Sequence, residues 1–395
     1  MALAPLPSGT PKVIVPRAYY GRYVPSGHVI YVQKDRLFAA RFDLERMEVI
    51  GQGVPILEAV GASVGSGGAQ VAFSSEGTLV YLPESFVPAP MSWASRDGET
   101  SLLRPTASNW ANPRFSPDGR RLAFEINNGS PRDIFVYEME RDTLTQLTFD
   151  PADDSYAIWS PDGRRIAFSS DRDQRGRANL YWMNADGSNE AKRLTQSADN
   201  ELAGSWHPSG KWLAFWTANP KSMDLRILPI EGDDVSGLTA GKPFTFLGST
   251  ANEVRPMFSP DGRWIAYSAG PFGAAEVFVR PFPGPGGQWR ISRRGGWFPR
   301  WSPREPHLLF IELAHRSVKY VDYHGEGGSF TASEPSVWTP ASYMGIGDNS
   351  TYDPHPDGQR LVMRLDRKNR DTVVLFQNFF DYLKRVLPEK QGSER

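Results

Sequence analysis

The chain has 395 residues, of which 44 are Lys or Arg and 45 are Asp or Glu, and it contains no cysteine. This balance provides no sequence-wide basic field for a phosphate backbone, so we do not expect nucleic acid as a partner. The lack of cysteine excludes disulfides, zinc–thiolate sites and thiol nucleophiles.

The N-terminal residues give no sign of export. Residues 1–12 have neither a basic leader nor a long apolar core, and no run of about 20 apolar residues occurs in the chain. We therefore expect a chain that does not insert into a membrane. The compartment stays open: cytoplasmic as the sequence is given, and extracytoplasmic if a signal or membrane span precedes Met1.

One unit is repeated along the chain. RFSPDGRRLAFE at residues 114–125 returns as IWSPDGRRIAFS at residues 158–169 and as MFSPDGRWIAYS at residues 257–268. Aligning the turn glycine, or the residue in its place, gives eight copies at intervals of roughly 40–50 residues, which is the length of a propeller blade. The eight aligned turn positions are Gly27, Gly77, Gly119, Gly163, Gly210, Gly262, Glu305 and Gly358.

Each copy predicts four antiparallel strands. An apolar run and an alternating Leu/Ile-Ala-Phe/Tyr stretch flank the turn, in which Pro fixes φ, Asp bonds its own backbone and Gly accepts positive φ. A third strand follows, for example at residues 133–140 or 179–185, and then a fourth, for example at residues 143–148. A single four-stranded blade cannot cover both of its faces, so the blades must pack around an axis and close.

The two ends of the chain decide how such a ring closes. The eighth copy lacks a fourth strand because a helix-compatible segment follows at residues 378–390. Residues 11–16 are expected to supply that strand. We therefore predict an all-β fold in one domain over residues 1–395: an eight-bladed β-propeller with its blades in residues 20–376, an N-terminal closing strand and a short C-terminal helix. Seven blades are the alternative if the first or seventh copy is irregular.

The repeated unit resembles the repeat of TolB-type propellers over residues 25–365. Residues 20–57 and 277–292 are similar to the propeller tails of bacterial serine/threonine protein kinases. This resemblance implies a bacterial signalling module that senses or binds a protein. The kinase itself has no counterpart here, since the chain has no Gly-rich nucleotide loop, HRD or DFG motif. We expect a monomer.

Catalytic motifs are weak. Gly61, Ser63 and Gly65 match a nucleophile elbow, but they lie in a Gly-rich crossover and not between a strand and a helix. The six histidines lack the spacing of a zinc protease, and residues 171–176 lack the terminal Glu of a calcium loop. We therefore assign no catalytic, cofactor-binding or metal-ligating residue.

Residues just ahead of each first strand are the candidate ligand-binding positions, because in a propeller we expect the axial funnel to open there. Their arginines could grip a carboxylate or a peptide C-terminus, and their acidic groups could balance that charge or take a divalent cation. The alternative is that they pair with one another and hold adjacent blades in register. The candidates are Tyr20, Arg22, Asn112, Arg114, Asp154, Tyr156, Glu201, Glu253, Arg255, Trp297, Arg300 and Asn349.

Two functions follow from this sequence. The first is a non-catalytic binding or sensing module that presents the funnel to a protein or a small polar ligand. The second is a funnel-site enzyme, either a metal-dependent, lactonase-like hydrolase or a polysaccharide lyase, since propellers host such chemistry. The sequence favours the first, because the repeats contain no recognisable set of nucleophile, base and orienting group, or of metal ligands.

Overall fold

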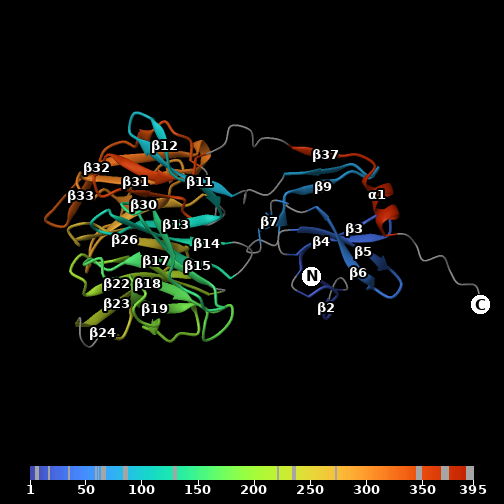
Figure 1. Cartoon of the computed structure of the whole chain (residues 1–395), viewed down its shortest axis with the longest axis horizontal. Coiled ribbons are helices and arrows are strands. Elements are labelled where there is room, and N and C mark those ends of the chain that lie inside the picture. The colour runs from blue at the N-terminus through green and yellow to red at the C-terminus, as the bar shows by residue number, and fades with distance from the viewer. Residues whose placement is uncertain are drawn as a thin grey trace, which may run out of the picture. The chain divides into compact units, whose positions relative to one another are not determined.

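The computed structural model describes the chain except for residues 5–8, 17, 34–35, 58–59, 61, 64–67, 83–87, 128–130, 220–221, 234–236, 272–273, 344–348, 366–372 and 388–395. Among the described residues the fold is all-β, with ten antiparallel sheets, of which five are four-stranded. A short helix lies near the C-terminus (Figure 1). The chain forms two compact units. One comprises Met1–Val87 and Arg367–Arg395, and the other, here called the propeller unit, comprises Pro88–Asp366.

Six sheets lie among the described residues of the propeller unit. In the first five, a copy of the repeat supplies the strands in sequence order, starting with the strand before the turn. The first two sheets are β13 (Trp110–Phe115), β14 (Arg121–Ile126), β15 (Asp133–Glu138) and β16 (Thr143–Gln146), and then β17 (Asp154–Trp159), β18 (Arg165–Ser170), β19 (Asn179–Asn184) and β20 (Lys192–Arg193). The third consists of β21 (Asn200–Trp206), β22 (Trp212–Ala218), β23 (Met223–Asp233), β24 (Gly237–Ala240) and β25 (Phe244–Leu247), and the fourth of β26 (Glu253–Phe258), β27 (Trp264–Ala269), β28 (Glu276–Pro281) and β29 (Trp289–Arg290). The fifth consists of β30 (Trp297–Trp301), β31 (His307–Glu312), β32 (Ser317–Glu326), β33 (Ser329–Ala332) and β34 (Ser336–Thr339), with a 3₁₀ turn at Leu313–His315.

The sixth sheet closes the ring with strands from both ends of the unit. Its order is β12 (Thr100–Ser108), β11 (Ala89–Ser95), β36 (Arg360–Met363) and β35 (Tyr352–Pro354). The first strands of neighbouring sheets contact each other in the order β13, β17, β21, β26 and β30, and β35 contacts β13. The hydroxyl of Tyr352 in β35 donates to the carbonyl of Phe298 in β30 at 2.6 Å, and this bond joins β30 to β35. These six strands, here called the inner strands, therefore surround a common axis.

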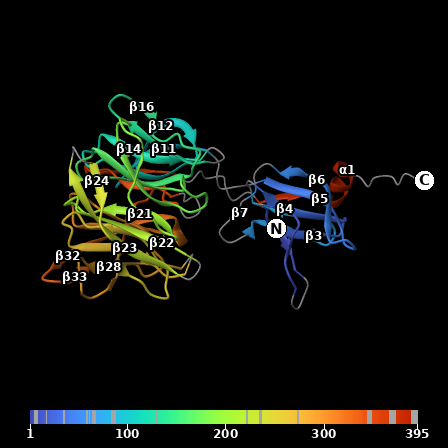
Figure 2. The same cartoon turned by 90° about the horizontal axis from the view of Figure 1, so that it is seen from below.

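The other unit has its own sheets. They are β3 (Tyr19–Val24), β4 (His28–Gln33), β5 (Arg36–Asp43) and β6 (Glu48–Leu57); β9 (Val71–Phe73), β10 (Leu79–Tyr81) and β37 (Val374–Phe376); and the short pairs β1 (Ala2–Leu3) with β2 (Lys12–Val13) and β7 (Ala62–Ser63) with β8 (Gly68–Ala69). Helix α1 (Phe379–Val386) confirms the predicted C-terminal helix, although residues 388–390 lie outside the described part. Figure 2 shows α1 beside the strands of this unit. Phe379 and Leu383 of the helix bury their side chains in this unit's core with Ile30 and Leu79.

The closing strand predicted from the sequence was wrong. Of residues 11–16, Lys12 and Val13 form β2, which pairs with β1, whereas β11 and β12 complete the sheet of the eighth copy. The second and eighth copies thus exchange outer strands, since β37 pairs with β10 of the second copy. Equivalent copies have the same alternating pattern, so either pairing satisfies the local sequence. The single domain expected over residues 1–395 is therefore replaced by two units, and six sheets form the ring.

The repeated turn has the structural role that its sequence predicts. The Ser116 hydroxyl donates to Asp118 Oδ1 at 2.6 Å and accepts the amide of Arg121 at 2.9 Å, while Gly119 has a φ of 73°. The copies at Ser160 and Ser259 repeat this arrangement. The motif therefore fixes the hairpin that leads from each inner strand to the second strand.

Candidate functional site

A funnel opens on the axis of the propeller unit. It is a cavity of about 320 Å³ lined by the last residues of the six inner strands and by the turns that follow them. The sequence predicted a site at the other end of these strands, ahead of each inner strand, and that location stays a prediction. The residues that line the funnel are Arg114, Phe115, Ser116, Pro117, Ile158, Trp159, Pro161, Gly204, Ser205, Trp206, Pro208, Met257, Phe258, Ser259, Pro260, Arg300, Trp301, Pro303, Asp353, Pro354 and Pro356.

One repeat position supplies the centre of the funnel. It is the fifth residue before the turn glycine, or before Glu305 in the seventh copy, and we call it the funnel position. All six funnel-position residues of the ring line the cavity. They are Arg114, Ile158, Ser205, Met257, Arg300 and Asp353.

A bulge in the inner strands directs these side chains. The pairing register shifts just before the funnel position in β13, β17, β21, β26 and β30. Within the shifted stretch, Asn112, Tyr156, Arg255 and Phe298 have positive φ values of 49°, 55°, 61° and 57°. Bulges change the direction of the following side chains, and strained backbone of this kind gathers at functional sites. The residue two before the funnel position is called the bulge position below.

Three charged side chains meet at the funnel. Arg300 Nε lies 2.8 Å from Asp353 Oδ1, and Arg114 Nη1 lies 3.3 Å from the same oxygen. The amide of Phe115 donates to Asp353 Oδ2 at 3.0 Å. Arg114 belongs to β13, Arg300 belongs to β30, and Asp353 lies between them on β35. The cluster therefore spans three neighbouring blades.

The environment of Asp353 favours its neutral form. Burial raises its pKa to about 6, against the opposing effect of the Arg300 and Phe115 donors. At neutral pH the carboxylate balances one of the two guanidinium groups. Protonation below that value would leave both guanidinium groups without a counter-charge in the lining.

The funnel wall is aromatic and also holds adjacent blades together. The indole of Trp159 donates to the carbonyl of Arg114 at 2.9 Å, and the indole of Trp301 donates to the carbonyl of Met257 at 2.9 Å. Each bond joins one blade to the preceding blade. At these two positions an aromatic side chain thus packs between adjacent blades and also lines the funnel.

Only some of the predicted site residues meet at the funnel. Arg114 and Arg300 do, and their shared contact with Asp353 agrees with the alternative that these residues pair across blades. Tyr20 and Arg22 lie on β3, in the other unit. There the Tyr20 hydroxyl donates to the carbonyl of Val71, and Arg22 lies over the ring of Phe73. That these two residues share a site with the candidates of the propeller unit stays a prediction.

The acidic candidates lie at the start of the inner strands. Asp154 is fully buried, with Arg172 Nη2 3.0 Å from its Oδ2. Glu201 accepts from the Thr195 hydroxyl, and Glu253 accepts from the Ser249 hydroxyl. Burial raises the pKa of all three carboxyl groups. Their bonds stay near their own blades, so they do not balance the funnel arginines.

The polar pair Asn112 and Asn349 joins the first and last blades of the ring. The Asn112 amide nitrogen donates to Asn349 Oδ1 at 3.0 Å, and its amide oxygen accepts from the amide of Ser350 at 3.0 Å. Asn112 also donates to the buried carboxylate of Glu125. These bonds hold the two blades in register. They occupy both the amide nitrogen and the amide oxygen of Asn112, which leaves little hydrogen-bonding capacity for a ligand.

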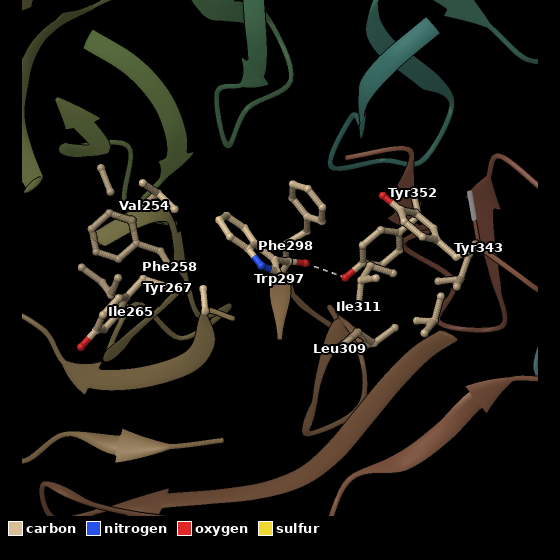
Figure 3. Close-up of a cluster of buried hydrophobic side chains, with 14 of the residues drawn as sticks. Val254, Phe258, Ile265, Tyr267, Trp297, Phe298, Leu309, Ile311, Tyr343 and Tyr352 are labelled. Carbon is tan, nitrogen blue, oxygen red and sulfur yellow. Dashed lines mark hydrogen bonds between the residues drawn. The ribbon is translucent and has the colours of Figure 1, made fainter. Parts of the chain in front are cut away.

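The remaining candidates form an aromatic cluster below the funnel. The guanidinium carbon of Arg255 lies 4.4 Å from the ring centre of Phe298 and 5.5 Å from those of Tyr156 and Trp216. Trp297 is buried beside Phe298, and Figure 3 shows both residues between Phe258 on one side and Tyr352 on the other. Cation–π contacts of this kind stabilise a buried arginine.

Sequence reasoning missed Asp353 and the apolar lining. Asp353 has the same offset from its turn glycine as Arg114 and Arg300, so the alignment of copies contained a signal for it. Trp206 and Phe258 form part of the funnel wall. The missing information was which end of the inner strand opens.

The described residues offer little support for other chemistry. No group of three or more His, Asp or Glu side chains among them could hold a metal ion. The elbow-like motif at Ser63 cannot be assessed, because Gly61, Gly65 and the Ser63 side chain lie outside the described part. Within the same described residues, no helix is both long and apolar enough to cross a membrane.

Comparison with known proteins supports the assignment of the repeat. Residues 99–246 match the family described as TolB beta propeller domain. An uncharacterized protein of Agrobacterium fabrum is 28% identical over 144 residues, covering 36% of this chain and 45% of that protein. The chain thus spans less than half of that relative's length.

Two solved structures are similar to this chain. A putative TolB from Agrobacterium tumefaciens aligns with a TM-score of 0.54 and 18% identity, over 71% of this chain and 99% of that chain. TolB from Acinetobacter baumannii aligns with a TM-score of 0.46 and 15% identity, over 89% of this chain and 80% of that chain. Together with the six inner strands and their repeated turns, the first of these structures shows that the propeller unit has a β-propeller fold, and over residues 99–246 its repeats are similar to those of TolB propellers.

Proposed function

We propose that the propeller unit is a non-catalytic binding module that presents its axial funnel to a protein. TolB-like propellers are commonly protein-binding modules, and the observation that carries the proposal is the funnel itself. All six blades contribute to its lining, and charged, aromatic and prolyl side chains converge there. A concave, largely apolar site with a few convergent polar groups is the usual form of a binding pocket.

A sensing role extends this proposal. Residues 20–57 and 277–292 are similar to the propeller tails of bacterial serine/threonine kinases, which supports a place in a signalling protein. A small polar ligand is the other occupant of the same funnel that its chemistry supports. We make no proposal of metal-dependent hydrolysis or polysaccharide cleavage, since no specific feature of the funnel favours either.

Site-directed photocrosslinking tests the proposal. A photoreactive phenylalanine at the exposed rim residue Pro208 is compared with the same residue at Arg141, whose side chain is 75% exposed on the hairpin after β15. A protein partner from the native host should crosslink at position 208 and not at position 141. Equal crosslinking at both positions, or crosslinking at 141 alone, would show that the funnel is not the binding surface.

A further inference from the structure

The funnel carries an excess positive charge. Arg114 and Arg300 are two cations, Asp353 is one anion, and the other lining residues are uncharged. Both oxygens of Asp353 are already engaged, Oδ1 by the two guanidinium groups and Oδ2 by the amide of Phe115. A guanidinium group in a largely apolar setting favours an anion within hydrogen-bonding reach.

Arg114 is the better placed of the two arginines to bind a ligand. Its side chain is 17% exposed, whereas that of Arg300 is 3% exposed. Its Nη1 contacts Asp353, and its Nη2 lies 3.8 Å from the thioether sulfur of Met257, which is a weak acceptor. Because a guanidinium group has five N–H donors in a planar fork, Arg114 can bind a second carboxylate without releasing Asp353.

The layer beneath the funnel makes it a dead end. Five of the six bulge-position side chains are buried, so almost no solvent reaches this layer from the funnel. They are Asn112, Ala203, Arg255, Phe298 and Thr351. A polypeptide therefore cannot run straight through the funnel, and a chain that enters it must either end there or turn back.

The wall of the funnel matches an apolar side chain. Trp159, Trp206, Phe258 and Trp301 stand around the charged cluster, and prolines from the turns follow them toward the rim. Phe258 packs edge to face against His207 and Phe282, so its ring is fixed in place. The arrangement combines an anion-binding centre with a rigid aromatic surround.

We propose that the funnel binds the C-terminal carboxylate of a polypeptide whose last side chain is apolar, with Arg114 as the principal carboxylate-binding residue. This inference rests on the proposed function and names the chemistry of the partner. The terminal carboxylate neutralises the excess positive charge, and the last side chain contacts the aromatic wall. The preceding residues of the peptide extend past the rim into solvent. An internal Asp or Glu side chain offers the same group but brings chain on both sides, which the dead end disfavours.

Two peptide libraries test the proposal with the full chain. Both are immobilised through their N-termini and have randomised sequences, and they differ only in ending as a free carboxylate or as an amide. We expect binders from the carboxylate library, with an affinity at least about tenfold above that of the matched amides. Within the amide library, peptides with an internal Asp or Glu show whether a side-chain carboxylate can substitute. Acetate and inorganic phosphate, added alone, test a small anion as the occupant.

Variants link the binding to the charged cluster. Arg114→Gln should weaken binding at least about tenfold, and Arg114→Lys should weaken it less, because it keeps the charge but loses the fork. Asp353→Asn should strengthen binding by about threefold or more, since it removes the competing carboxylate. Arg141→Gln is the matched control outside the funnel, and tryptophan fluorescence melting establishes that each variant is folded.

The outcomes are distinct. Equal binding of acids and amides, or binding indifferent to Arg114→Gln, would overturn the carboxylate proposal. If a partner still crosslinks at position 208, the proposed binding function survives that result. Binding confined to acetate or phosphate, selection of internal acidic residues, or an absence of binders in both libraries would also overturn the C-terminal proposal.

Discussion

At the scale of single residues, Asp353 connects stability to the charge of the funnel. It is the acidic residue among the described funnel-lining residues, and burial raises its pKa above the unfolded value of 3.8. The folded protein therefore keeps a proton that the unfolded chain has lost at intermediate pH. Stability from this group is fully present below the unfolded pKa and disappears as the pH rises through about 6.

Asp353→Asn removes this titration, so the variant is the reference against which the natural protein is compared. We expect the unfolding free energy of the natural protein, relative to the variant, to increase by about 1–3 kcal/mol between pH 7 and pH 4. His355, which also acts on Asp353, is present in both proteins, as are Arg114 and Arg300. Denaturant unfolding at several pH values measures the difference. A flat difference over this range would contradict the assignment, and Asp381→Asn, in the other unit, is the control.

Turn glycines report on contacts between blades. Gly262 and Gly210 have φ values of 73° and 74°, so alanine is strained at both. A Cβ at Gly262 would lie 2.3 Å from Nε2 of His207 on the neighbouring blade, whereas a Cβ at Gly210 would meet no atom within 4 Å. Comparing alanine variants at the two positions thus distinguishes the effect of backbone strain from that of a clash at the blade interface.

We expect Gly210→Ala to cost about 1 kcal/mol of unfolding free energy and Gly262→Ala to cost more. Adding His207→Ala should recover part of the loss in the Gly262→Ala protein, because the clashing ring is removed, and should recover none in the Gly210→Ala protein. Double-mutant cycles from denaturant unfolding provide the measurement. Equal costs at both glycines would show that the contact with His207 does not restrain this turn.

At the scale of elements, the strands that close the ring can be identified by proline substitution. Strand β11 is central in its sheet, and Ser92 is paired with Met363 of β36 and with Leu102 of β12. Strand β2 pairs only with β1 among the described strands. Proline removes a backbone donor and is disfavoured in a central strand.

Ser92→Pro should therefore destabilise the propeller unit by about 3 kcal/mol or more, while Lys12→Pro should leave its unfolding transition unchanged. Ser92→Ala controls for loss of the buried hydroxyl. The transition is followed by tryptophan fluorescence, since all 12 Trp residues lie between Trp93 and Trp338. A loss of stability with Lys12→Pro and none with Ser92→Pro would mean that the N-terminal strand closes the ring.

At the scale of the whole molecule, two hydrophobic cores predict two unfolding transitions. Ile30 is fully buried in the core that includes Phe379 and Leu383, and Ile166 is fully buried between blades of the propeller unit. Each unit buries apolar surface of its own, which is the requirement for independent folding. Tryptophan fluorescence reports the propeller unit, whereas far-ultraviolet circular dichroism reports both.

Ile30→Ala and Ile166→Ala form a matched pair of core truncations. Each should cost about 2–5 kcal/mol in its own unit. Ile166→Ala should lower the transition seen by tryptophan fluorescence, and Ile30→Ala should lower only a transition seen by circular dichroism. If Ile30→Ala shifts the fluorescence transition equally, the two units unfold as one cooperative body.

The sequence by itself determined the local structure. The spacing of the Ser-Pro-Asp-Gly turns predicted the hairpins, and the alternating apolar residues predicted the strands that flank them. The TolB-like repeat and the C-terminal helix also followed from it. These features depend on residues close together in the chain, so turn chemistry and periodicity predict them without knowledge of tertiary contacts.

Only the tertiary structure decided which strands pair, how many sheets enter the ring and which end of the inner strands opens. Copies with the same pattern are interchangeable locally, so the exchange of outer strands between the second and eighth copies has no local signature. The meeting of Arg114, Arg300 and Asp353 likewise depends on ring closure, because residues hundreds of positions apart come together only when β35 lies between β30 and β13. Pairing between distant strands is a property of the assembled ring, and the repeats alone leave it undetermined.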